Sequence, residues 1–404
     1  MRLLFVADGR SPIAQSWIRY FVQAGHEAHL VSTFPAEPDP ALASLSVVRV
    51  AFSGAAGDVP RPGGAPGGAR GMTVRAFVRH WLGPLTLPAA GRRLRKRILD
   101  LRPDLVHALR IPYEGMLAAA AAPAAPLLVS VWGNDFTWHA PASPAMRTWT
   151  RRVLGGAAAL HVDCRRDARL AREWGFPSGR PVLLLPTNGG IRPQVFHPIE
   201  AGRVEARVEA LETIPPQAPV IINPRGFRSY IRSDTFFRSL PFLLAEQPEA
   251  HILCPAMAGE PEAERWLDRL GLRRSTHLLP RMAPEQMAAL YQRAAVTVSL
   301  SEHDGTPNTL LEAMACGCFP VAGDLESIRE WIESGSTGYL VDVNRPEDVA
   351  QAVLRALRAP ELRRQAALLN ARRVAEQASY DRRMPEVEAR YRQLAGAHAE
   401  IGSS

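Results

Sequence analysis

Short apolar runs alternate with longer amphipathic stretches along the whole chain. Short apolar runs bounded by turn residues are typical of strands buried on both faces, and a 3.6-residue apolar period is typical of the helices that cover them. The pattern therefore predicts parallel sheets covered by helices. We expect strands at 3–7, 28–32, 47–52, 105–108, 127–132, 160–163, 182–185, 220–223, 251–254, 276–279, 296–300, 319–322 and 339–343.

The predicted strands fall into two series, which indicates two domains. A chain of 404 residues is too long for one ordinary core, and the second series starts after a join near 196–202. We predict an α/β fold with two doubly wound, Rossmann-like domains, one at 1–198 and one at 199–379. The Gly- and Pro-rich stretch at 53–71 has no periodicity and is expected to be a loop.

The run "SLSEHDGTPNTLLEAMACGCFPVAGD" places Asp304 and Glu312 around the start of a predicted helix that ends near Gly317. The free N–H groups and the positive dipole end of a helix N-terminus attract phosphate. Carboxylates accept hydrogen bonds from the hydroxyl groups of sugars and ribose. The segment thus predicts a sugar-nucleotide site. On spacing alone, the alternative is that Thr306 or Asn308 only caps the helix and both acids are solvated.

This segment resembles the Glu-x7-Glu signature of family 4 retaining glycosyltransferases, written here as Asp-x7-Glu. The resemblance continues in order through most of the chain. It includes "FVADGRSPIAQSWIRYFVQAGHEAHLVS", "PDLVHALRIPYEG", "LLVSVWGNDF", "LLPTNGGIRPQVFHP", "INPRGF", "LLPRMAPEQMAALYQRA" and "GSTGYLVDVNRPEDVAQAV". It implies the GT-B fold, in which the two domains face each other across a cleft. It also implies that a C-terminal helix, about 380–396, packs back on the first domain.

The resemblance also implies roles for residues of the second domain. Glu312 would hold the nucleotide ribose, and Asp304 the hydroxyl groups of the donor sugar. Arg225 matches the basic residue that neutralises the diphosphate, and Arg228 and Arg232 are candidates for the lysine that the family usually adds and this chain lacks. The remaining donor-binding residues would be Gly305, Thr306, Pro307, Asn308 and Thr309 for sugar and diphosphate, and Pro280, Arg281 and Met282 for the base.

Two departures from the family pattern change this picture. Asp304 is one methylene shorter than the usual first Glu, and Trp132 takes the place of a histidine often found there. Trp132 is either a core aromatic at a strand end or a surface on which the acceptor stacks. Asp135 then becomes the first-domain carboxylate expected to face the cleft, as a fourth catalytic candidate beside Arg225, Asp304 and Glu312. The acceptor-side residues would be Trp132, Gly133, Asn134, Asp135, Arg10 and Ser11.

The resemblance implies transfer of a sugar from a nucleoside diphosphate sugar to an acceptor hydroxyl with retention of configuration, in the synthesis of cell-surface polysaccharide, glycolipid or another glycoconjugate. Family frequency favours UDP. No Asp-x-Asp triplet is present, so we expect no metal and no cofactor. Two other interpretations stay open, namely a GT-B epimerase or phosphorylase, and a sugar-nucleotide-binding protein without activity.

The net charge of +8 comes almost entirely from arginine. This excess fits binding of phosphates or an anionic surface, or a composition bias that also enriches Ala, Pro and Gly. Residues 61–102 hold ten basic residues and one acid, interleaved with apolar residues. They predict either docking on an anionic membrane or a helix whose apolar side packs on its own domain.

The remaining sequence features concern location and other partners. The four cysteines lack metal-site spacing, and the apolar start at 3–7 is too short for a signal peptide. We expect a cytoplasmic protein. If residues 61–102 dock on an anionic membrane, the protein would attach peripherally to the inner face of the plasma membrane. No nucleic-acid-binding module is recognisable.

Overall fold

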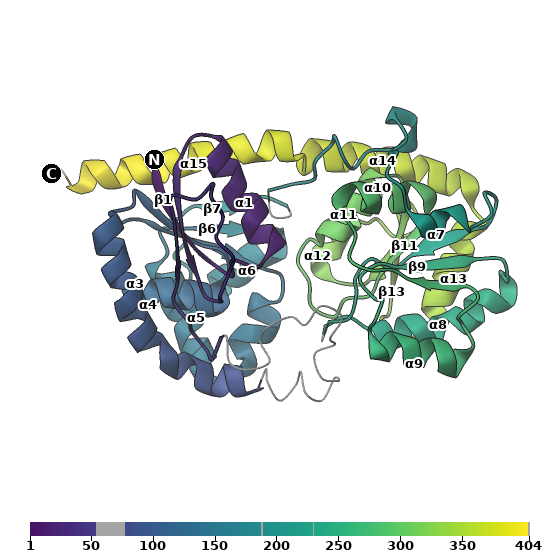
Figure 1. Ribbon diagram of the computed structural model, residues 1–404, viewed down its shortest axis with the longest axis horizontal. Helices are drawn as coiled ribbons and strands as arrows, with labels where there is room; N and C mark the ends of the chain where they lie inside the picture. The colour runs from purple at the N-terminus through teal and green to yellow at the C-terminus, as the bar shows by residue number, and fades with distance from the viewer. Residues whose placement is uncertain (54–76, 187–188, 229, 403–404) are drawn as a thin grey trace. The chain divides into compact units, whose positions relative to one another are not determined.

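The computed structural model describes residues 1–53, 77–186, 189–228 and 230–402 of the chain. The chain divides into two compact units (Figure 1). The first unit contains the described residues up to Gly189, together with the chain from Arg382 onward, and the second unit runs from Gly190 to Asp381. Each unit is an α/β sandwich with one sheet, so the predicted fold class is confirmed.

The first unit is built on a seven-stranded sheet in the order β3-β2-β1-β4-β5-β6-β7. All neighbouring strands pair in parallel, so their carboxyl ends meet at one edge. The strands are β1 (Arg2–Ala7), β2 (Glu27–Ser32), β3 (Ser44–Val47), β4 (Leu105–Ala108), β5 (Leu127–Val131), β6 (Ala159–Val162) and β7 (Val182–Leu184).

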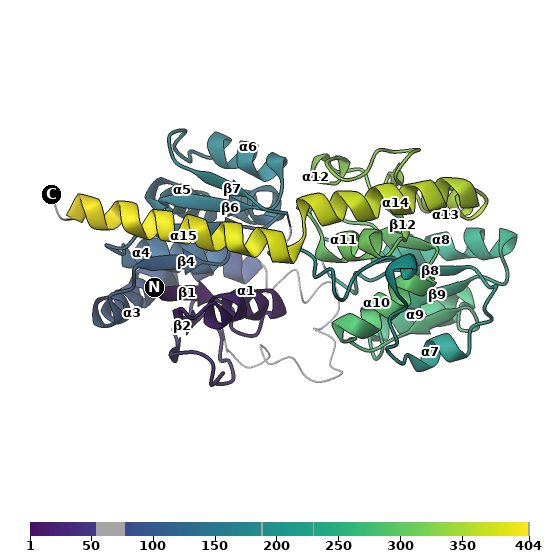
Figure 2. The same cartoon turned by 90° about the horizontal axis from the view of Figure 1, so that it is seen from above.

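Helices cover both faces of this sheet (Figure 2). The first helix shows why they form where they do: the Ser11 hydroxyl accepts from the Ala14 N–H, Trp17 and Phe21 are buried, and the helix ends before Gly25, whose φ is 79°. The helices are α1 (Pro12–Gln23), α3 (Leu87–Leu101), α4 (Met116–Ala121), α5 (Pro144–Gly156), α6 (Arg165–Glu173) and α15 (Tyr380–Gly402), with a helical turn at 77–82 before the 3-10 turn η1 (Gly83–Thr86).

The strand predicted at 47–52 was wrong, because β3 ends where that strand was expected to begin. Val50 and Ala51 are buried as expected for a strand, but in an irregular segment. The Ser53 hydroxyl accepts a hydrogen bond from the Val50 N–H, and the Thr86 hydroxyl accepts one from the Ala51 N–H. Side chains therefore take the place of the strand-to-strand hydrogen bonds that a strand would make. Ala51 also has a φ of 52°, which a strand does not allow. The predicted loop at 53–71 lies, apart from Ser53, outside the described residues.

A hydrogen-bonded chain of side chains runs through the core of the first unit. Trp17 Nε1 donates to the Tyr391 hydroxyl at 2.9 Å, and that hydroxyl contacts His107 Nδ1 at 2.5 Å. His107 Nε2 and His161 Nδ1 each lie 2.9 Å from the Ser130 hydroxyl. Every donor finds one acceptor if both histidines are neutral, and burial lowers the pKa of each. This series of hydrogen bonds fixes α15 to the sheet of the first unit.

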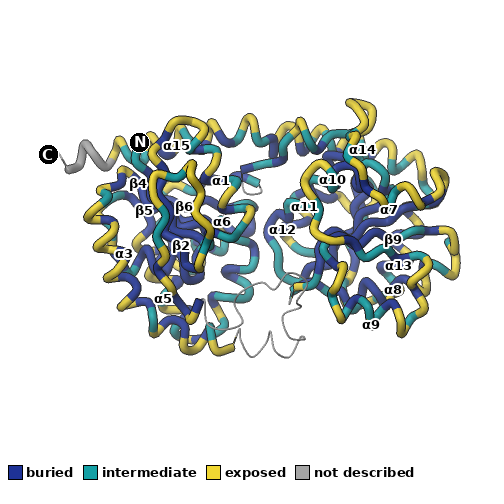
Figure 3. Tube along the Cα trace, in the orientation of Figure 1, coloured by how far each residue is buried: buried dark blue, intermediate teal, exposed yellow. Residues whose placement is uncertain are grey.

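The second unit has a six-stranded parallel sheet in the order β10-β9-β8-β11-β12-β13. Two apolar clusters cover its two faces, so the strands are buried while the outer helix faces are exposed (Figure 3). Its strands are β8 (Val220–Ile222), β9 (His251–Cys254), β10 (Thr276–Leu278), β11 (Val296–Ser299), β12 (Phe319–Gly323) and β13 (Tyr339–Val341). Its helices are α7 (Glu209–Glu212), α8 (Ser233–Glu246), α9 (Pro261–Leu270), α10 (Pro284–Arg293), α11 (Asn308–Ala315), α12 (Glu326–Arg329), α13 (Pro346–Leu357) and α14 (Pro360–Gln377).

Among the described helices, none combines the length and apolar character that a membrane span needs.

Candidate functional site

The loop between β11 and α11 is held rigidly at the carboxyl edge of the second sheet. Gly305, Thr306 and Pro307 are buried, and the Ser327 hydroxyl donates to the Asp304 carbonyl at 2.7 Å. Pro307 is the N-cap residue of α11 and has no side chain that could accept a hydrogen bond. The N-cap residue therefore leaves the first N–H groups of α11 to other partners, and an anion is a suitable partner at a helix N-terminus.

Arg225 follows β8 and reaches the start of α11 from the neighbouring strand. It is only 7% exposed, and its guanidinium forms an ion pair with Asp304. It also donates to the Thr309 hydroxyl at 3.0 Å and lies 3.5 Å from the Ser301 hydroxyl, which itself donates to Asp304 at 2.9 Å. The structure thus brings together three residues that the sequence singled out, namely Arg225, Asp304 and Thr309.

Glu312 lies one turn into α11 and is half-buried. Burial raises the pKa of its carboxyl group to about 7, although the Tyr291 hydroxyl, 3.4 Å away, and the charge of Arg225 both lower it. The carboxylate is therefore poised to change its charge near neutral pH. Sequence reasoning missed Tyr291, which is fully buried on α10 and is revealed only by the packing of α10 against α11.

The other two arginines proposed for the diphosphate are placed differently. Arg228 is exposed and donates to the Tyr230 hydroxyl at 3.0 Å. Arg232 forms a two-pronged pair with Asp234 and donates to Glu302 at 3.1 Å. The structure therefore commits the guanidinium of Arg232 to neighbouring carboxylates, and its role at the diphosphate stays a prediction.

The segment predicted to contact the base follows β10 at the same edge of the sheet. Pro280 and Arg281 are exposed, and Met282 packs against the core. The Pro280 carbonyl accepts the Ala256 N–H at 3.0 Å, which ties this turn to the loop after β9. This contact occupies the Pro280 carbonyl and leaves the backbone of Arg281 as the more accessible part of the turn.

In the first unit, Asp135 lies in the interior rather than at an open surface. It is 1% exposed and accepts hydrogen bonds from Arg110 at 2.8 Å and from the N–H groups of Ile111 and Trp132, each at 3.1 Å. A carboxylate with these partners orders the loops after β4 and β5. Its predicted catalytic role stays a prediction, because any contact with an acceptor would have to pass through the groups that it holds.

Trp132 is half-buried, and the Arg110 guanidinium lies 4.8 Å from the centre of its ring. Arg110 also donates to the Asn134 side chain at 3.0 Å, and Arg166 donates to the Gly133 carbonyl at 2.7 Å. The segment 132–135 is therefore a fixed loop at the carboxyl end of β5. Its aromatic ring pairs with a cation instead of lying in the core cluster.

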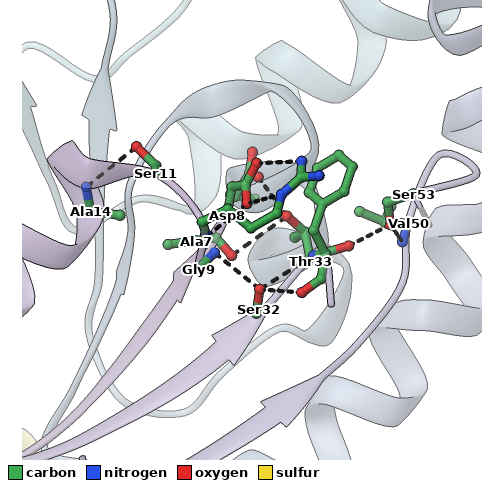
Figure 4. A network of polar contacts seen from close by, with 12 residues as sticks. Ala7, Asp8, Gly9, Ser11, Ala14, Ser32, Thr33, Val50 and Ser53 are labelled. Carbon is green, nitrogen blue, oxygen red and sulfur yellow. Dashed lines mark hydrogen bonds and ion pairs between the residues drawn. The ribbon is translucent and has the colours of Figure 1, made fainter. Parts of the chain in front are cut away.

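Arg10 and Ser11 lie at the carboxyl end of β1. Arg10 pairs through two nitrogens with Asp8, at 3.0 and 2.9 Å, and its guanidinium lies 3.7 Å from the centre of the Phe34 ring. Ser11 caps α1, so its side chain has a structural task. Figure 4 shows the neighbouring network, in which the Ser32 hydroxyl accepts the Gly9 N–H at 3.0 Å.

The structure has two parallel-sheet units, and one sheet edge of the second unit carries an arginine, two carboxylates and a helix start, which is the arrangement that the sequence predicted for a glycosyltransferase. Two family models match the sequence: the glycosyl transferase 4-like domain over residues 9–187, and glycosyl transferases group 1 over residues 214–371. The chain belongs to this family of glycosyltransferases, as the sequence motifs predicted.

Individual relatives agree with this assignment. The chain is 25% identical over 231 residues to a D-inositol 3-phosphate glycosyltransferase of Streptosporangium roseum, covering 53% of this chain and 52% of the relative. It is 29% identical over 251 residues to one of Geodermatophilus obscurus, covering 59% and 53%. The chain thus spans about half the length of the curated relatives it matches.

Solved structures share the fold at low sequence identity. Sucrose-phosphate synthase from Thermosynechococcus elongatus superimposes with a TM-score of 0.75 at 16% identity, over 98% of this chain and 100% of that one. Anabaena HepE, solved in complex with UDP and glucose, gives a TM-score of 0.69 at 13% identity, over 96% and 98%. These likenesses establish the two-domain GT-B architecture.

Proposed function

We propose that the protein transfers a sugar from a nucleoside diphosphate sugar, with UDP favoured, to an acceptor hydroxyl with retention of configuration. The observation that carries this proposal is the group formed by Arg225, Asp304, Thr309 and Glu312 around the open start of α11. A planar guanidinium and a helix N-terminus suit a diphosphate, and a carboxylate one turn further along suits a ribose diol. Family membership and the fold shared with a UDP complex support the same function.

Arg225 and the N–H groups of α11 would stabilise the charge that builds on the leaving diphosphate. Both are fixed before any reaction by the contacts described above, so little reorganisation is needed. The proposal includes no metal, because these groups can carry the electrostatic task. The leaving phosphate would accept the proton of the attacking hydroxyl, which makes a histidine at position 132 dispensable.

Release of UDP from UDP-glucose in the presence of a cell extract as acceptor source tests this proposal. We expect Arg225→Ala to lower turnover by roughly 100- to 1,000-fold, the usual effect of removing one preorganised donor. Arg364→Ala, which removes a 73% exposed arginine on α14, should leave turnover unchanged. Binding of UDP-glucose without any nucleotide release would instead favour a binding protein, and a rearranged but untransferred sugar an epimerase.

We also propose that the first unit docks on anionic membrane. The side chains of Phe77, Val78, Trp81, Leu82 and Leu85 are all exposed, with Leu85 reaching 73%. These five side chains therefore do not follow the alternative of packing on their own domain, whereas the apolar side of α3 does, because Leu87, Leu94 and Ile98 lie in the core. Helix α3 adds five exposed basic residues close by in sequence, namely Arg92, Arg93, Arg95, Lys96 and Arg97. An apolar stripe beside basic residues is typical of peripheral binding to anionic lipid.

Co-sedimentation with liposomes tests the docking surface. We expect binding to phosphatidylglycerol-containing vesicles that weakens as salt rises, and little binding to pure phosphatidylcholine. The double change Phe77→Ser and Trp81→Ser should reduce binding, whereas Leu368→Ser, at an exposed apolar position of α14 in the other unit, should not. Equal binding by all three proteins, or none to anionic vesicles, would refute the proposal.

A further inference from the structure

The hydroxyl of Tyr291 is directed at the carboxylate that we assign to the donor ribose. Tyr291 is fully buried on α10, which packs against α11 (Figure 1). Its hydroxyl donates to Oε2 of Glu312 at 3.4 Å. A buried tyrosine hydroxyl needs a hydrogen-bonding partner, and here the partner is a group of the donor site.

The position of the Tyr291 ring is fixed from two sides. The Cys318 thiol donates to the Tyr291 carbonyl at 3.0 Å, which ties the end of α10 to the residue before β12. The centre of the buried Phe196 ring lies 6.3 Å from that of Tyr291. The Gln292 amide donates to the His197 carbonyl at 3.0 Å and holds the segment that carries Phe196 against α10. A side chain held in this way directs its hydrogen bond without reorganisation.

Glu312 has one oxygen engaged by the protein and one left to a ligand. Among the described residues, the Tyr291 hydroxyl is the one donor at this carboxylate, and it contacts Oε2. Burial raises the pKa of the Tyr291 hydroxyl, which therefore keeps its proton and remains a donor. Each carboxylate oxygen can accept, and the half-buried side chain of Glu312 is within reach of solvent. Oε1 is thus the oxygen that a ribose hydroxyl can reach.

The other titratable and charged groups around this pair come from neighbouring elements. Arg225, after β8, lowers the pKa of Glu312 through its charge, which it shares with Asp304. Burial raises the pKa of the thiols of Cys316, one turn further along α11, and of Cys318, so both stay uncharged near neutral pH. Helix α14 also packs against α11, and it buries three residues that do not titrate, namely Ala366, Asn370 and Val374.

We propose that Tyr291 is a positioning residue of the donor site, whose hydroxyl holds Oε2 of Glu312 so that the ionised carboxylate presents Oε1 to a ribose hydroxyl of the donor. This rests on the proposed function, because it concerns the donor of that reaction. An ionised carboxylate accepts stronger hydrogen bonds than a neutral carboxyl group. A hydrogen bond donated to the carboxylate favours its ionised form. The alternative is that Tyr291 only fills the core and takes the nearest acceptor.

Calorimetric titration with UDP-glucose from pH 6 to pH 9 tests this inference, with the wild type compared with Tyr291→Phe. The pKa of Glu312 is about 7 with the hydroxyl in place. Loss of the hydroxyl should raise it by about one unit, the effect of losing a modest hydrogen bond to a charged group. The wild type should therefore bind about tenfold more tightly than the variant at pH 6 and about fivefold at pH 7, and the two should be nearly equal at pH 9. Groups that titrate in both proteins cancel in this ratio.

Two control variants separate positioning from packing. In a Glu312→Gln background the amide does not titrate, so Tyr291→Phe should change the affinity by the same factor at every pH. Tyr339→Phe removes the hydroxyl of a half-buried tyrosine on β13 of the same unit and should leave UDP-glucose binding unchanged. A general loss of packing in Tyr291→Phe would lower the affinity alike across the pH range.

The inference is overturned if the ratio of wild-type to Tyr291→Phe affinity is the same from pH 6 to pH 9. It is also overturned if the same pH-dependent ratio persists in the Glu312→Gln background. A wild-type protein that does not bind UDP-glucose would refute the proposed function and this inference with it. Binding by the wild type with a ratio independent of pH would remove the role of Tyr291 alone and leave the donor site standing.

Discussion

The raised pKa of Glu312 leads to a quantitative prediction. An increase from the ordinary 4.5 to about 7 corresponds to about 3 kcal/mol of cost for ionising this carboxyl group in the folded protein. The folded state therefore binds the proton more tightly than the unfolded state. Below pH 4.5 the group is protonated in both states and carries no penalty. As pH rises toward 7, the unfolded state gains free energy of ionisation first, and stability falls.

The assay is a comparison of urea unfolding between the wild type and Glu312→Gln from pH 5 to pH 8. The amide retains the shape and an oxygen that accepts from Tyr291, but it does not titrate. The wild type should lose about 2–3 kcal/mol relative to the variant over this range. All other groups titrate in both proteins and cancel in the difference. Because the two units can unfold separately, the transition of the second unit is the one to follow.

The same pKa predicts how donor affinity depends on pH. If ionised Glu312 holds the ribose, UDP-glucose should bind about tenfold more weakly at pH 6 than at pH 8, because about a tenth of the carboxylate is ionised at the lower pH. The diphosphate of UDP-glucose does not titrate in this range. Glu312→Gln should bind with low and nearly constant affinity. A variant that shows the wild-type pH dependence in both stability and binding would refute the reasoning.

Two further predictions concern one hydrogen-bonded group in the first unit and one at the donor site. Tyr391→Phe leaves the Trp17 N–H and His107 Nδ1 buried without their partner. The free energy of unfolding of the first unit, measured by heat or urea, should therefore fall by about 2–3 kcal/mol, while UDP binding is kept. An unchanged unfolding free energy would show that these hydrogen bonds do not stabilise the unit. Asp304→Asn removes the charge that compensates Arg225. Calorimetry should therefore show that UDP binds a few-fold more tightly to this variant. Weaker binding would mean that the Asp304 carboxylate itself contacts the nucleotide.

Much of the fold followed from local patterns, because buried parallel strands read as short apolar runs. The strand at 47–52 failed for a physical reason: buried apolar residues occur equally in an irregular segment whose N–H groups are satisfied by Ser53 and Thr86. The apolar pattern indicates which residues are buried, but it does not indicate which groups accept hydrogen bonds from their backbone N–H groups. That distinction needs partners that are distant in the sequence.

The same limit explains the site. The positions of Arg225 and Glu312 near the start of α11 follow from strand order and motif, and the structure brings them together. The ion pair of Arg225 with Asp304 joins residues 79 positions apart, and the contact of Glu312 with Tyr291 joins two helices. Asp135 shows the reverse case: its place after β5 suggested a carboxylate that faces the cleft, and only the structure shows the three donors that hold it in the interior.

The ion pair between Arg225 and Asp304 determines how the second unit can attract a diphosphate. In the second unit, Asp304 already balances the charge of Arg225, so part of the attraction for a diphosphate has to come from other groups. These are the N–H groups at the start of α11, where the N-cap residue Pro307 offers no side-chain acceptor, and the exposed Arg228. Arg225 then contributes direction and hydrogen bonds more than net charge.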